Sequence, residues 1–105
     1  IMMESDFKKE ILSKYLSIGE EKFYKFLLVQ AISKLISIES GSYKGISPEI
    51  EFLAFSDKFI TLYRREGDQN YLIIAKLFRR AAHKIYRIML KKSLTSHNSK
   101  FLNVV

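Results

Sequence analysis

The sequence predicts an all-α fold, a compact bundle or array of about four helices. Apolar residues recur at helical spacing along most of the 105 residues, and only four glycines and one proline interrupt the chain. No stretch alternates cleanly between apolar and polar residues, as a half-buried strand would. The breaks in the periodicity divide the chain into predicted helices at about residues 5–18, 20–39, 48–66 and 69–92, followed by a flexible tail.

The first two predicted helices meet at Gly19. Residues 5–18 carry an apolar side at helical spacing, made of Phe7, Ile11, Tyr15 and Ile18. Residues 20–39 are apolar over most of their circumference and leave only a narrow polar strip. A helix of this kind is normally contacted from several directions. We therefore expect residues 20–39 at the centre of the fold, with exposure of one side to a partner as the alternative.

The third predicted helix follows the clearest loop, residues 39–47. Ser47, Pro48 and Glu49 are typical of a cap, a first helical position and a first-turn acid. An apolar stripe then runs through Phe52, Phe55, Phe59 and Leu62. Phenylalanines at this spacing indicate core packing, with a ligand groove as the less favoured interpretation.

The fourth predicted helix, residues 69–92, begins after a stop at Gly67 and a cap at Asp68. Its apolar side has helical spacing and consists of Ile74, Phe78, Ala81, Ala82, Ile85 and Met89. The tail that follows has no strong period. The sequence thus predicts one helical domain over residues 1–93 and a flexible or loosely packed tail over residues 94–105.

The composition disfavours catalysis, metal binding and a membrane span. The chain has no cysteine, and its two histidines, His83 and His97, have no acidic residue near them in sequence. We expect no enzyme activity, no cofactor and no metal site. The most apolar stretch is too short and too polar to cross a bilayer, so the expected location is intracellular and soluble, in cytoplasm or nucleus.

Positive charge is concentrated in the last third of the chain. Residues 1–68 contain ten Lys or Arg and eleven Asp or Glu, a net charge of −1. Residues 69–105 contain eight Lys or Arg and no acid, a net charge of +8. At about 100° per residue, five basic residues fall on the helix face opposite the apolar side and form a basic ridge. The ridge consists of Lys76, Arg80, Lys84, Arg87 and Lys91.

This basic ridge is the main functional lead. The favoured interpretation is a non-enzymatic protein-interaction domain, an adaptor or scaffold, that engages an acidic partner segment, with Arg79 and Tyr86 beside the ridge. Nucleic-acid binding through contacts to phosphates is the alternative, although no Asn or Gln accompanies the arginines between residues 79 and 92. Homo-oligomerisation through residues 20–39 is a second alternative. A basic face that is merely solvated would explain the same pattern without any partner.

Overall fold

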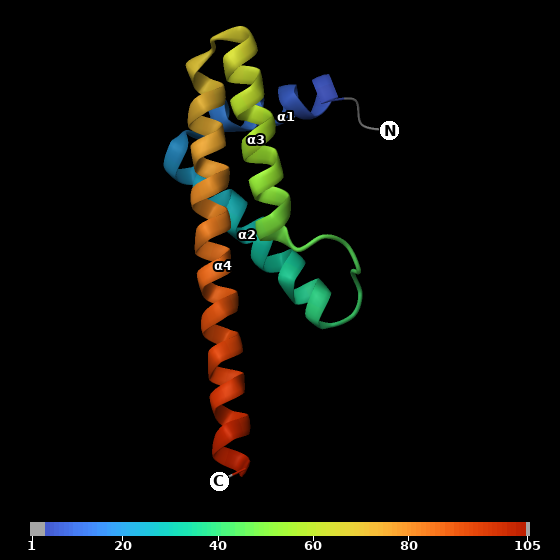
Figure 1. The fold of residues 1–105 in the computed structure, drawn as a ribbon. Helices are drawn as coiled ribbons and strands as arrows, with labels where there is room; N and C mark the ends of the chain where they lie inside the picture. The colour runs from blue at the N-terminus through green and yellow to red at the C-terminus, as the bar shows by residue number, and fades with distance from the viewer. Residues whose placement is uncertain (1–3, 105) are drawn as a thin grey trace.

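The protein folds into four α-helices, as predicted. The structure is a computed structural model that describes the backbone of residues 4–104 and the side chains of residues 6–92. Its helices are α1 (Glu4–Ile18), α2 (Glu20–Glu39), α3 (Pro48–Glu66) and α4 (Gln69–Val104), and the described residues contain no strand (Figure 1). The first three helices begin and end within a residue of the predicted positions.

Helix α4 is longer than the sequence analysis predicted. It continues past Lys92 to Val104 and has 36 residues. A helix of that length spans about 54 Å at 1.5 Å per residue, and the longest dimension of the molecule is 58 Å. Figure 1 shows the last turns of α4 running beyond the start of α3. The side chains of residues 93–105 lie outside the described residues, so loose packing of residues 94–105 stays a prediction.

The turns between helices follow from local sequence. Gly19 and Gly67 have φ angles of 85° and 78°, a region that glycine enters without the steric cost of a Cβ atom. The Gly67 N–H donates to the Tyr63 carbonyl oxygen at 2.7 Å and closes α3. Asp68 then accepts a hydrogen bond from the Asn70 N–H at 2.9 Å through Oδ1, which caps α4. The predicted stops at these glycines are confirmed.

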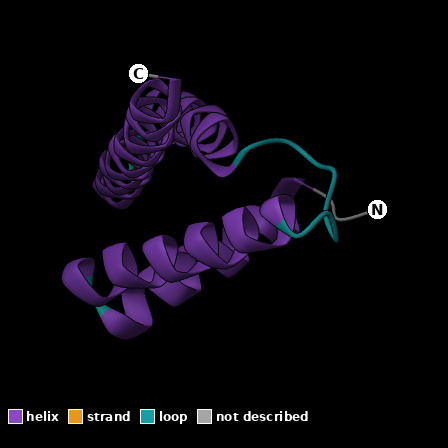
Figure 2. Ribbon diagram, turned by 90° about the horizontal axis from the view of Figure 1, so that it is seen from below, coloured by secondary structure: helices purple, strands orange, loops and turns teal. Residues whose placement is uncertain are grey.

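The four helices form two layers. Helices α3 and α4 are antiparallel and pack along one another (Figure 1), and α1 and α2 lie together on one side of that pair (Figure 2). Helix α2 packs mainly on α4, and the loop at residues 40–47 returns the chain from α2 to the start of α3. Helices α2 and α4 each contact the other three helices, but α4 packs far more extensively on α3 and supplies most of the buried residues, so it occupies the centre of the fold.

The core is built from aromatic rings that surround Phe78. The Phe78 ring lies 5.3–6.1 Å, centroid to centroid, from four other phenylalanines: Phe23, Phe52, Phe55 and Phe59. Three of these contacts have the edge-to-face geometry that the ring quadrupole favours. The phenylalanine stripe of α3 is therefore core, as the favoured interpretation had it.

The expectation that residues 20–39 form the central helix is wrong. Only Phe23, Leu27 and Ala31 of α2 are fully buried. The largest share of the buried core belongs to α4, in Tyr71, Ile74, Ala75, Leu77, Phe78, Ala81, Ala82 and Ile85. The small side chains of Ala75, Ala81 and Ala82 let neighbouring helices approach α4 on two sides. Helix α2 is left with an apolar side that nothing in the described chain covers.

Candidate functional site

The basic ridge lies on the outer face of α4. Its five residues, Lys76, Arg80, Lys84, Arg87 and Lys91, are all exposed, and so are Arg79 and Tyr86 beside it. The buried residues of α4 point the other way, into the aromatic core. The separation follows from the helical period, which places residues three and four apart on the same face. The structure therefore brings all the predicted partner-binding residues onto one surface.

Arg80 differs from its neighbours on the ridge because it contacts α2. Its guanidinium carbon lies 4.0 Å from the centroid of the Tyr24 ring, and its Nη1 is 3.5 Å from Oε1 of Glu21. Stacking on an aromatic face combined with a carboxylate contact is a favourable setting for a guanidinium group. Arg80 thus anchors the edge of the ridge to the first turns of α2.

Most of the other cations on and beside the ridge have no acidic partner in the described part of the chain. Within the described side chains, Lys76, Arg79, Lys84 and Arg87 make no ion pair. A shallow hollow of about 380 Å³ lies on this face and is lined by Lys76, Arg79, Arg80, His83 and Arg87. No acidic side chain lines it. Such a hollow suits carboxylate or phosphate oxygens, which accept charge-assisted hydrogen bonds from guanidinium and ammonium groups.

Apolar surface borders the ridge on one flank. Tyr86 is 55% exposed and Leu90 is 46% exposed. They lie four residues apart and therefore one above the other on α4. The sequence predicted Tyr86 beside the ridge, and the structure leaves both Tyr86 and Leu90 accessible. A ligand that contacts the ridge can bury these two side chains as well.

On its other flank the ridge meets an apolar groove that the sequence analysis missed. The groove has a volume of about 600 Å³ and lies between the C-terminal half of α2, the loop before α3 and α4. Its apolar walls are Ile32, Leu35, Ile36 and Ile38 from α2 and Ile88 and Met89 from α4. Glu39 and Lys92 also line it and form an ion pair with each other. Two features of the sequence indicate this groove: residues 20–39 are apolar over most of the helix circumference, and Ile88 lies outside the core stripe of α4.

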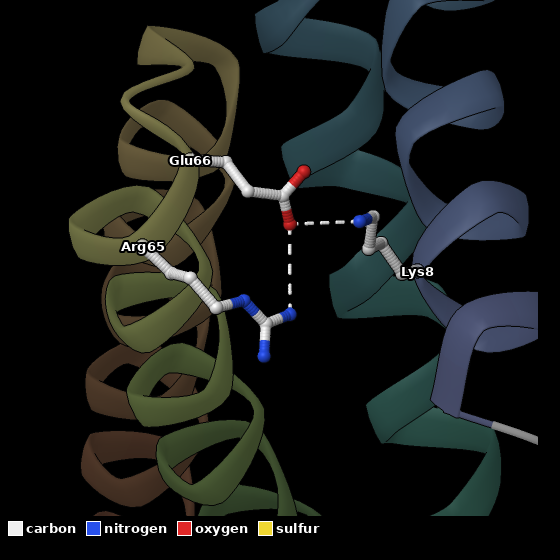
Figure 3. Close-up of polar contacts among 3 residues, drawn as sticks. All are labelled: Lys8, Arg65 and Glu66. Atoms are coloured by element: carbon white, nitrogen blue, oxygen red, sulfur yellow. Dashed lines mark hydrogen bonds and ion pairs between the residues drawn. The ribbon is translucent and has the colours of Figure 1, made fainter.

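A separate polar cluster joins α1 to the end of α3, away from the ridge (Figure 3). Lys8 Nζ donates to Oε2 of Glu66 at 2.8 Å, and Arg65 Nη2 lies 3.5 Å from the same oxygen. The hydrogen bond from Lys8 lowers the pKa of Glu66, and Arg65 lowers it further. The Glu66 carboxylate lies between two cations and links α1 to the end of α3, so this cluster is structural.

The described residues contain no group of three or more His, Asp or Glu side chains that could hold a metal ion. His83 is exposed on the ridge, and the side chain of His97 lies outside the described residues. Nor does any helix in the described part of the chain combine the length and the apolar character needed to cross a bilayer.

Comparison of the chain with protein-family models, with curated proteins and with solved structures found no match.

Proposed function

We propose that this chain is a helical protein-interaction domain that engages an acidic segment of a partner protein through the basic ridge of α4. The observation that carries the proposal is the group formed by Lys76, Arg79, Lys84 and Arg87. These four cations share one exposed face and make no ion pair with the described side chains.

An anionic partner would relieve the electrostatic repulsion between neighbouring cations on α4. Lys76, Arg80 and Lys84 follow one another at intervals of four residues, and like charges at that spacing destabilise a helix by a few tenths of a kcal/mol per pair. Within α4 no acid is available to offset them. Carboxylates placed in the hollow would turn these repulsions into charge-assisted hydrogen bonds.

The apolar flank supports a protein partner in preference to nucleic acid. Tyr86 and Leu90 offer anchor surface beside the charge, and a polypeptide can bury them with one apolar side chain. A nucleic acid would leave Leu90 without a matching group, and the stretch from Arg79 to Lys92 contains no Asn or Gln to read base edges.

Charge reversal on the ridge tests the proposal. The variant Lys84→Glu/Arg87→Glu changes two exposed cations that make no ion pair among the described residues. The probe is a labelled peptide rich in glutamate with one leucine anchor, titrated at physiological salt. We expect the double variant to bind this peptide at least about tenfold more weakly than the wild type, a loss of roughly 1.4 kcal/mol.

The matched control is Lys22→Glu/Lys25→Glu, which makes the same change of charge on exposed residues of α2. Equal weakening by both variants would show that only net charge matters and would reject the ridge as the site. A labelled mixed-sequence DNA duplex is titrated in parallel at low and physiological salt. Duplex binding that falls steeply with salt and is lost in the ridge variant, without peptide binding, would favour the nucleic-acid alternative instead.

A further inference from the structure

We propose that the apolar groove beside the ridge receives an amphipathic α-helix of the partner, whose acidic residues border its apolar face. The inference rests on the proposed function, because it assumes the same acidic partner, and it adds the conformation of the bound segment. The groove has two helical walls, α2 and α4, and its lining is apolar apart from Glu39, Lys92 and the loop residue Ser47. Grooves of this kind receive the apolar face of a helix in many recognition domains.

The extent of the exposed apolar surface favours a helix over a small ligand. On α2, Val29, Ile32 and Ile36 are 62%, 42% and 61% exposed, and their spacings of three and four put them on one stripe. Ile32 and Ile36 line the groove, whereas Val29 continues the stripe beyond it. The stripe is roughly 10 Å long at the helical rise, which two turns of a docked helix would cover. A small molecule confined to the groove would leave Val29 in water.

Positive charge beside the groove favours an acidic partner helix. Ile88, on the α4 wall, has Lys84 four residues before it and Lys92 four residues after it. Residues four apart on a helix are neighbours, so a lysine lies on each side of the apolar wall. Lys84 makes no ion pair with a described side chain. Lys92 is paired with Glu39, so an acid on a docked helix would meet Lys84 directly and would share Lys92 with Glu39.

A second copy of the chain fits this charge pattern less well. Residues 69–105 carry a net charge of +8, so two copies that meet near α4 bring like charges together, which costs free energy. An acidic helix brings the opposite charge to the same place. Charge complementarity therefore favours a different protein as the occupant.

Two peptides of identical composition test the inference. One places leucines at helical spacing with flanking glutamates, and the other has the same residues in scrambled order. Fluorescence anisotropy measures the affinity, and circular dichroism measures the helicity gained on binding. We expect the wild type to bind the amphipathic peptide at least about tenfold more tightly than the scrambled one, with a gain of helicity only for the former.

The groove variant Ile36→Ser/Ile88→Ser should abolish that preference. Both side chains are exposed, so the fold is expected to persist, and Val29→Ser provides a second variant still further from the core. The control is Leu16→Ser/Ile50→Ser, two exposed apolar residues that do not line the groove, and it should keep the preference.

Each other outcome overturns the inference in a distinguishable way. If the groove variant binds like the wild type while Lys84→Glu/Arg87→Glu does not, the ridge recognises acids without the groove. If neither peptide binds, the proposed function fails together with the inference. If the wild type is dimeric by sedimentation and the groove variant is monomeric, the occupant is a second copy of this chain.

Discussion

At the scale of single residues, one buried hydroxyl joins α3 to α4. Ser56 on α3 is 2% exposed, and its Oγ donates to the carbonyl oxygen of Ala75 on α4 at 2.8 Å. A buried hydroxyl needs such a partner, because leaving it without one costs about 1–3 kcal/mol. Among the side chains described, no buried polar atom lacks a hydrogen bond. The close approach of α3 to α4 at Ala75 is therefore compatible with a polar residue in the core.

Replacing Ser56 with alanine should weaken the fold measurably. The change removes the hydrogen bond to Ala75 but creates only a small void, so we expect Ser56→Ala to lower the free energy of unfolding by about 0.5–1.5 kcal/mol. Urea unfolding monitored by circular dichroism provides the measurement. Ser13→Ala, at an exposed position of α1, should change stability by less than about 0.5 kcal/mol. Equal effects of the two substitutions would contradict a role for the buried bond.

At the scale of elements, ion pairs connect helices that share little core. Lys8 on α1 pairs with Glu66 at the end of α3, and Lys34 on α2 pairs with Glu51 on α3, each at 2.8 Å (Figure 3 shows the first). The hydrogen bond to Glu51 raises the pKa of Lys34, as the hydrogen bond to Glu66 raises that of Lys8. Both pairs join the first layer of helices to the second.

The pair between Lys8 and Glu66 should make stability depend on acid pH. Because the folded state lowers the pKa of Glu66 below its ordinary value of 4.5, the pair stabilises the fold above that value. The contribution is lost as the pH falls through the lowered pKa. We therefore expect Lys8→Met to be less stable than the wild type at neutral pH, with a difference that shrinks as the pH falls below the ordinary pKa of 4.5.

Urea unfolding across this pH range measures the difference. Lys9→Met is the matched control, since Lys9 is exposed next to Lys8 and makes no ion pair with a described side chain. The control should track the wild type at every pH. A difference for Lys8→Met that stays constant down to the lowest pH would show that lost packing, and not the charge of Glu66, causes the destabilisation.

At the scale of the whole molecule, the described core reaches Met89 on α4, and the helix itself continues further. The described apolar residues that pack together extend from Phe7 to Met89, whereas α4 continues to Val104. Stability of a small domain comes mainly from burial of apolar side chains. The described core lies within the predicted domain of residues 1–93, and the boundary of that domain stays a prediction.

Removal of residues 94–105 tests that boundary. We expect a chain that ends at Ser93 to keep the urea midpoint of the full chain and to lose helical circular dichroism only in proportion to the residues removed. A second truncation that ends at Arg87 also removes Ile88 and Met89, and it should lower the midpoint because Met89 packs against the core. A large loss of stability in the chain that ends at Ser93 would show that residues 94–105 belong to the folded unit.

The sequence by itself determined the helices and the faces of the last one. Gly19, Gly67 and the Ser47–Pro48 pair end or begin helices through local sterics and capping, which depend on neighbours in the chain. The end of α4 was harder to predict because no glycine or proline follows Lys92. The separation of the core stripe from the basic ridge likewise follows from the helical period alone. These features could be predicted without knowing how the helices pack.

Only the tertiary structure decided which helix is central and what the ridge adjoins. Residues 20–39 are the more apolar segment, yet α4 supplies most of the buried core, including the small side chains of Ala75, Ala81 and Ala82. The contacts of Arg80 with Tyr24 and Glu21, and the groove between Ile36 and Ile88, join residues more than fifty positions apart. Helical periodicity assigns a residue to a face of its own helix, whereas the neighbour that covers this face depends on the packing of the whole chain.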